Sequence, residues 1–189
     1  EKVSLVLGYF DSFPMIVGDI ANSRLTVLRE AFDFQNQTAS RTKRTPEAEA
    51  TMERYRSLLQ QIKRSGQPLQ EFERISVSHD AVWQFLAGVV DAEGSIGLKK
   101  RGQTYEPFFA VAMKDRKIIE LFPEFLGVGN VRHRGDGLYH YEINSADDVL
   151  NAIEVFILPC KRKETKARME ETKRILNDYM RDTKFEKSW

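Results

Sequence analysis

The chain has one cysteine, six prolines and no long apolar run among its 189 residues. A lone thiol, Cys160, excludes a disulfide within the chain and fits a reducing compartment. No hydrophobic segment is long enough to cross a bilayer, and no signal peptide is visible. We therefore expect a protein that is not secreted, that has no membrane partner, and that works in the cytoplasm or inside an organelle.

An excess of charge of one sign is also missing, since 29 basic and 28 acidic side chains leave a net charge of +1. The distribution along the chain is less even. Residues 161–189 carry ten basic and six acidic side chains, and residues 95–145 carry eight and six. Positive charge therefore flanks the acidic segments 81–94 and 146–160. This pattern suits a protein that contacts a phosphate backbone beside a metal site.

Residues 86–94 read LAGVVDAEG and lie between a helical pattern and an alternating one. Asp91 and Glu93 place two carboxylates at the end of the predicted helix, where a carboxylate can bind a divalent cation. Small residues follow one narrow strip of the same helix: Ala81, Gly88 and Ala92. Because small residues let helices approach closely, this strip predicts a helix–helix contact, within the chain or across a dimer axis.

After Gly94 the hydrophobic period changes from that of a helix to that of a strand. Apolar and polar side chains alternate over 95–101 and again over about 106–113. Turn and capping residues then separate further segments, at Gly102, Asp115, 135–137 and Ser145. The order helix, two strands, helix, two strands, helix predicts an α+β fold with helices on one face of a four-stranded antiparallel sheet. A last helix, about 163–180, is expected to bury Met169, Ile175, Leu176 and Tyr179.

The first 77 residues indicate a mainly helical extension whose role the sequence does not reveal. Thr45 before Pro46, with Gly66 beyond, predicts a helix over 46–65. A shorter helix is expected near 23–34, with a polar basic loop at 35–44. We divide the chain into this extension, 1–77, and a domain with a C-terminal helix, 78–189.

The string LAGVVDAEG resembles the signature of LAGLIDADG homing endonucleases. Val89 and Val90 stand at its apolar positions, and Glu93 keeps the final acid. A packed helix with a solvated acidic end would explain a shorter string, but nine residues in this order favour the family. The likeness spans about 78–180, and it implies an αββαββα core whose open sheet face binds DNA. It also implies an intron-encoded endonuclease that hydrolyses phosphodiester bonds and leaves short 3′ overhangs.

In this family the last acid of the signature binds the metal, and the preceding residue adds its backbone carbonyl. Those positions are Glu93 and Ala92 here. Oxygen ligands favour hard cations, so the resemblance implies Mg²⁺, for which Mn²⁺ can substitute.

Basic residues near the metal polarise water and counter phosphate charge in the family. CKRKETKAR resembles the family's basic stretch and indicates Lys163, with Lys161 as the neighbouring candidate; a solvated charge run explains these lysines almost as well. Lys117 matches a further basic position, whereas Met113 stands where the family often has glutamine. The implied catalytic residues are thus Glu93, Lys163, Lys161 and Lys117.

Strand alternation predicts which side chains share the uncovered sheet face. A two-stranded ribbon fits the major groove, where arginine and lysine read guanine edges. We expect this face to be strongly basic and to contact DNA through Ser95, Gly97, Lys99, Arg101, Glu106, Asn130, Arg132, Arg134, His140 and Glu142.

One signature per chain supplies one metal-binding acid, whereas cutting two DNA strands needs two. The resemblance therefore implies a homodimer whose motif helices meet along Ala81, Gly88 and Ala92, and a long, near-palindromic double-stranded target. Two alternatives stay open: an RNA-binding maturase that assists intron splicing, and a DNA-binding regulator that has lost catalysis. Glu93 argues against the second, because a degraded signature usually loses this acid.

Overall fold

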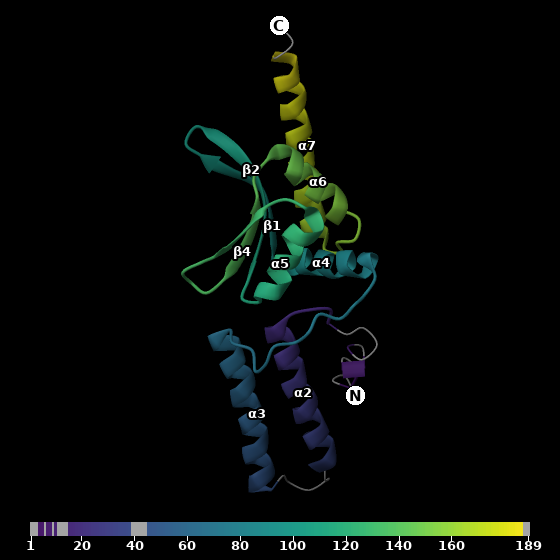
Figure 1. Ribbon diagram of the computed structural model, residues 1–189, viewed down its shortest axis with the longest axis vertical. Helices are drawn as coiled ribbons and strands as arrows, with labels where there is room; N and C mark the ends of the chain where they lie inside the picture. Colours follow the sequence, from purple (N-terminus) through teal and green to yellow (C-terminus); the bar gives the residue numbers. More distant parts are fainter. Residues whose placement is uncertain (1–3, 6, 9, 11–14, 39–44, 187–189) are drawn as a thin grey trace. The chain divides into compact units, whose positions relative to one another are not determined.

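Figure 1 shows the computed structural model, which describes residues 4–5, 7–8, 10, 15–38 and 45–186. The chain divides into two compact units, residues 1–76 and 77–189. The sequence predicts a polar loop at 35–44. Residues 35–38 are instead the end of a helix, and residues 39–44 lie outside the described part of the chain. None of the described helices is long and apolar enough to span a membrane.

The first unit is built on two helices, α2 (Asp19–Thr38) and α3 (Pro46–Ser65), which pack against each other. The Thr45 hydroxyl accepts a hydrogen bond from the Ala48 backbone, so α3 begins where the sequence predicts. The segment after α3 is bonded to α2, because the Phe72 amide donates to Asp19 Oδ1 at 2.7 Å and the Leu69 amide donates to Ser23 Oγ at 2.9 Å.

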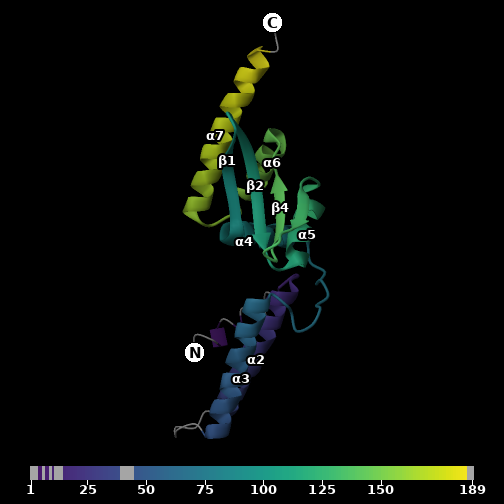
Figure 2. The ribbon, with the colours of Figure 1, turned by 90° about the vertical axis from the view of Figure 1, so that its left-hand side faces the viewer.

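The second unit contains the predicted order of elements, confirming the α+β fold. Its elements are α4 (His79–Glu93), β1 (Gly94–Arg101), β2 (Thr104–Met113), α5 (Arg116–Leu126), β3 (Asn130–His133), β4 (Tyr139–Ile143), α6 (Ala146–Phe156) and α7 (Lys163–Glu186). The sheet order is β1-β2-β4-β3, and all neighbours are antiparallel. α4, α5 and α6 pack against one face, and Figure 2 shows the other face uncovered by the described helices of this unit.

Four aromatic side chains form the centre of the core between the sheet and its helices. Phe109, Phe122, Tyr141 and Phe156 have no exposed surface. The rings of Phe109 and Phe156 stack with centroids 5.5 Å apart, and those of Phe122 and Tyr141 stack at 5.3 Å. Each buried ring stabilises the fold by roughly 1.5–3 kcal/mol, so this cluster joins β2 and β4 firmly to α5 and α6.

The buried side of α7 differs from the prediction. Met169 and Leu176 are buried as expected, but Ile175 is half-buried and Tyr179 is 61% exposed. α7 packs against β1 and α6. Near the β1–β2 turn it borders an open groove of about 810 Å³, which Tyr105, Pro107 and Tyr179 help to line. Tyr179 faces this groove, so its position on the apolar side of the helix does not bury it.

Gly129 shows how closely the chain approaches the core. Its φ is +90°, and a Cβ there would lie 2.5 Å from the ring of Tyr141, whose hydroxyl donates to the Val128 carbonyl at 2.9 Å. Gly127 also has a positive φ, of +71°, but a Cβ there would meet open space.

We therefore expect Gly129→Ala to lower the free energy of unfolding by about 2–4 kcal/mol, since it adds overpacking to backbone strain. Gly127→Ala adds the strain alone and should cost about 1 kcal/mol. Chemical denaturation of both variants measures the difference. Equal losses would show that contact with Tyr141 is not what requires glycine at 129.

Candidate functional site

The motif helix α4 continues to Glu93, so both carboxylates of the motif lie in its last turn. The helix is capped at its start by the Ser78 hydroxyl, and at its end the Gly94 amide donates to the Val90 carbonyl. A Cβ on Gly94 would overlap this same carbonyl. Because β1 begins at Gly94, the final glycine of the motif is what allows a strand to follow the helix without a linker.

The two faces of α4 differ sharply. Leu86, Ala87, Val89 and Val90 are buried, whereas Gly88, Ala92 and Glu93 are exposed. Of the predicted contact strip, Gly88 and Ala92 therefore face outward, while Ala81 is half-buried. Next to Gly88 lies a hollow of about 320 Å³, and its lining residues are Gln84, Gly88, Asp91, Pro159 and Lys161.

Asp91 joins the end of α4 to the segment that precedes α7. Its carboxylate accepts hydrogen bonds from the backbone amides of Lys161 and Arg162. The Arg162 guanidinium donates to the Asp91 carbonyl at 2.9 Å and so satisfies a carbonyl that the helix end leaves open. Arg162 lies between the two predicted lysines, but nothing in the sequence indicates that its side chain returns to the end of α4.

The environment of Asp91 favours its ionised form. Burial raises the pKa of this carboxyl, but hydrogen bonds from the Lys161 and Arg162 amides and from the Cys160 side chain outweigh burial, so the pKa is lowered. Burial, with the nearby Asp91 charge, raises the pKa of the Cys160 thiol to about 12. Cys160 is therefore a buried thiol that packs beneath the motif, and its Sγ lies 3.5 Å from the Ala87 carbonyl.

The predicted metal ligands lie at the exposed end of this anchored helix. Among the described residues, no hydrogen bond or ion pair in the structure engages the Glu93 carboxylate, and no group of three His, Cys, Asp or Glu side chains is placed to hold a metal. One exposed carboxylate with an adjacent carbonyl is a hard oxygen donor set that fits Mg²⁺ or Ca²⁺ in type, but it is incomplete. Further oxygen ligands have to come from water, DNA or a second motif.

The three predicted catalytic lysines lie near the motif to different degrees. The Lys161 backbone contacts Asp91 directly, and Lys163 begins α7 two residues later with an exposed side chain. Gly94 pairs with Val111, so the last residues of β2, up to Met113, lie at the end of the sheet where β1 begins. α5 starts just after β2, so Lys117 lies at the same end of the strands as Glu93.

The strand register places most predicted DNA-contact residues on the uncovered face. Lys99 pairs with Glu106, Asn130 pairs with Glu142, and Arg132 pairs with His140. Ser95, Gly97 and Arg101 share this face by alternation along β1. Arg134 lies beyond β3, in the turn, where its Nη2 is 2.8 Å from Asp136 Oδ2.

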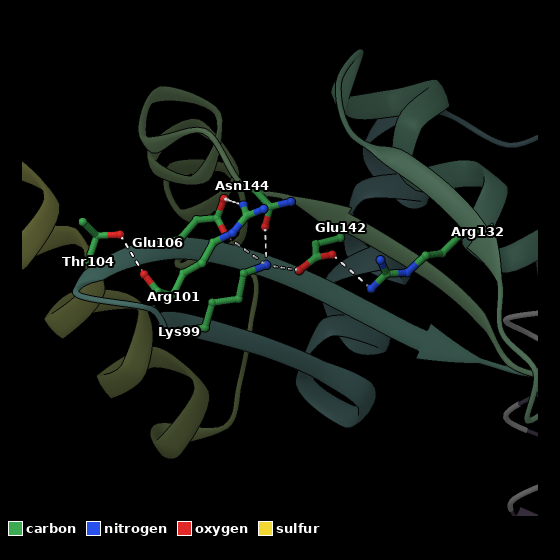
Figure 3. A network of polar contacts seen from close by, with 7 residues as sticks. All are labelled: Lys99, Arg101, Thr104, Glu106, Arg132, Glu142 and Asn144. Atoms are coloured by element: carbon green, nitrogen blue, oxygen red, sulfur yellow. Dashed lines mark hydrogen bonds and ion pairs between the residues drawn. The ribbon is translucent and has the colours of Figure 1, made fainter.

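The expectation of a strongly basic face is corrected by an ion network across the strands (Figure 3). Lys99 Nζ lies 2.7 Å from Glu142 Oε1 and 3.5 Å from Glu106 Oε2, and it donates to Asn144 at 2.8 Å. Arg132 and Arg101 pair with Glu142 and Glu106 at 3.2 and 3.1 Å. Two carboxylates thus offset part of the charge of three cations. Strand alternation does not predict Asn144, because it lies one residue beyond the end of β4.

The pKa values of two groups on this face, Glu142 and His140, are shifted. Burial raises the pKa of Glu142, but the hydrogen bond and charge of Lys99, followed by the charge of Arg132, outweigh burial and lower this pKa. Burial, followed by the charge of Arg132, lowers the pKa of His140, although Glu142 opposes this shift. His140 Nδ1 is buried and has no hydrogen-bond partner among the described residues. These shifts favour the charged form of Glu142 and the neutral form of His140.

Comparison with known proteins identifies what this arrangement resembles. The family model described as LAGLIDADG endonuclease matches residues 86–183. The homing endonuclease I-GzeII in complex with its DNA target has 16% sequence identity and a TM-score of 0.69, with 96% of this chain and 67% of that chain covered. I-SmaMI bound to an uncleaved DNA target in the presence of calcium ions has 16% identity and a TM-score of 0.69, covering 94% and 65%.

The likeness to these solved structures lies in the fold, and this chain spans about two thirds of their length. Comparison with curated protein sequences gives no significant match.

Replacing Asp91 by Asn should lower the free energy of unfolding by about 1–3 kcal/mol at pH 7, since charge-assisted hydrogen bonds are lost. The pKa of Asp91 in the folded protein lies below its ordinary 3.8, so its stabilisation is present above that value and is lost as pH falls through the folded pKa. Denaturation from pH 7 to pH 2 should therefore show the two proteins converging in acid.

Asp147→Asn is the control, because it removes an exposed carboxylate at the start of α6. It should have a smaller effect at pH 7. A constant gap between wild type and Asp91→Asn at every pH would show that the charge of Asp91 is not what holds the segment.

Proposed function

Because the chain belongs to the LAGLIDADG endonuclease family, we propose that it is an intron-encoded homing endonuclease that cuts a specific double-stranded DNA site and leaves short 3′ overhangs. One observation carries this proposal. The motif helix presents an exposed carboxylate, Glu93, at the edge of an open sheet face that bears three long cationic side chains. A site for phosphodiester hydrolysis and a surface for DNA therefore share one unit of the chain.

DNA binding is assigned to the sheet face. An antiparallel ribbon fits the major groove, and Lys99, Arg101 and Arg132 are side chains that can read guanine edges or contact phosphates. I-GzeII and I-SmaMI, which share this fold, are bound to DNA targets in their structures, and this supports the assignment.

Glu93 and the Ala92 carbonyl are the proposed ligands of a divalent cation, with Mg²⁺ the expected one. The presence of calcium ions in the I-SmaMI structure supports a divalent ion. When bound, such a cation supplies the positive charge that activates water and stabilises the departing 3′ oxygen. Lys161 and Lys163 would lie close to the scissile phosphate and offset its charge, while Asp91 and Arg162 hold the helix end in place. Lys117 is proposed as a further cation at this edge.

Two cuts require two such centres, and this sequence has one motif. We propose that two copies pair through their α4 helices to form a homodimer with a near-palindromic target. The outward positions of Gly88 and Ala92 support this, and the 320 Å³ hollow beside Gly88 gives room for a side chain of the partner helix.

Glu93→Gln tests the catalytic assignment. Duplexes that bind the wild-type protein are first selected from a randomised library in Ca²⁺, and cleavage is then measured in Mg²⁺. We expect the variant to lose cleavage by at least about 10²-fold, since its ligand charge is gone, while affinity in Ca²⁺ changes little. Glu154→Gln, on the outer side of α6, should cleave normally. Cleavage by Glu93→Gln at the wild-type rate would contradict the assignment.

Gly88→Leu tests the pairing of α4 helices. A Cβ at this position meets open space, and leucine favours a helix by about 1 kcal/mol over glycine, so each chain should still fold. We expect monomers by light scattering, with cleavage lost. Gly135→Leu places the same side chain at another glycine with open space around it, in the β3–β4 turn, and should stay dimeric. An active Gly88→Leu dimer would remove α4 from the interface.

A further inference from the structure

Glu142 occupies the centre of the sheet face, on the inner strand β4 between β2 and β3. Its side chain is only 15% exposed, whereas Lys99 is 39% and Arg132 is 64% exposed. The carboxylate therefore lies beneath the two cations, and a molecule approaching this face meets the cations first.

Both oxygens of Glu142 are occupied. Lys99 Nζ lies 2.7 Å from Oε1 and Arg132 Nη2 lies 3.2 Å from Oε2, and Figure 3 shows the two cations approaching from opposite sides. Lys99 belongs to the edge strand β1 and reaches across β2, with Nζ 6.0 Å from the ring centre of Phe108.

This arrangement has two physical effects that favour sequence-specific binding of DNA. Lysine and arginine side chains lose rotamer entropy when they are fixed, and holding them in place before binding removes part of that cost from association. A carboxylate beneath the cations also cancels charge that would attract any phosphate backbone, whatever its sequence.

We propose that Glu142 is a positioning residue for sequence recognition, one that holds Lys99 and Arg132 as fixed donors for base edges and weakens binding to non-target DNA. The inference rests on the proposed DNA-binding function and assigns a division of labour within it. Lys99 and Arg132 touch the DNA, and Glu142 acts through them. Glu106 is not equivalent, since it lies 3.5 Å from Lys99 and pairs with Arg101 near the β1–β2 turn.

The experiment uses binding in Ca²⁺ to a randomised duplex library, so that it does not depend on cleavage. Lys99→Ala and Arg132→Ala identify the base positions that these two residues read. Glu142→Gln keeps the size of the side chain and an acceptor oxygen but removes the charge. Glu120→Gln is the matched control, because it breaks a carboxylate–arginine pair with Arg116 on α5, away from this face.

We expect Glu142→Gln to relax the preference at the positions defined by Lys99→Ala and Arg132→Ala, and at no others. Affinity for the selected duplex should fall about tenfold, while affinity for a scrambled duplex should stay equal or rise. The slope of log affinity against log salt concentration should become steeper by about one for the scrambled duplex, since one more cation is available to phosphates. The control should change none of these.

Two further variants separate positioning from other roles. Glu142→Asp keeps the charge but shortens the reach, so it should relax the same positions without changing the salt slope. In Lys99→Ala, adding Glu142→Gln should cause no further loss at the position read by Lys99. If Glu142→Gln does not fold, Glu142→Asp and the melting temperature of each variant carry the test.

Three results would overturn the inference. Relaxed preference at a position that neither Lys99→Ala nor Arg132→Ala affects would make Glu142 a direct reader of a base. An equal loss for selected and scrambled duplexes would make its role purely structural. An unchanged preference would remove it from recognition. A wild-type protein that selects no sequence from the library would instead refute the proposed function itself.

Discussion

The contact between Asp91 and the backbone of Lys161 and Arg162 is the constraint on which the candidate site depends. α4 passes into β1 without a linker, so the direction of the helix end also sets where the sheet begins. Helix ends fray when their open carbonyls have no partner, and Arg162 supplies one for Asp91. The same contact brings the basic segment before α7 to the motif, so one interaction places both the acid and the bases of the proposed chemistry.

If the sheet face binds DNA as proposed, its charges combine affinity with selectivity. A surface of unpaired cations would bind any duplex, because phosphate contacts dominate non-specific affinity. In this protein Glu106 and Glu142 balance most of the charge of Lys99, Arg101 and Arg132. The small net charge of the chain, +1, is therefore consistent with a DNA-binding role, since selectivity gains when the cations are held by acids.

The sequence was sufficient to predict the elements and their order. Hydrophobic period, the capping residues Ser78, Thr45 and Ser145, and the turn glycines are local signals, and each acts within a few residues. The motif is also a local signal, because its nine residues are contiguous, and it was sufficient to predict the family. Burial on α7 was less predictable. Tyr179 lies on the apolar side of the helix but faces the open groove beside the β1–β2 turn, and helical spacing does not show whether other residues fill that groove.

The pattern of residues along the chain thus determined which segments are helices and strands and which faces are apolar. It also determined where the acids and bases of the candidate site stand along the chain. Only the tertiary structure decided which charges meet. Lys99 and Glu142 are 43 positions apart, and Asp91 and Arg162 are 71 apart. These pairs form because β4 lies beside β2 and because the segment before α7 returns to the end of α4. Ion pairs depend on distance in space, and the packing of the core, rather than the local sequence, sets that distance.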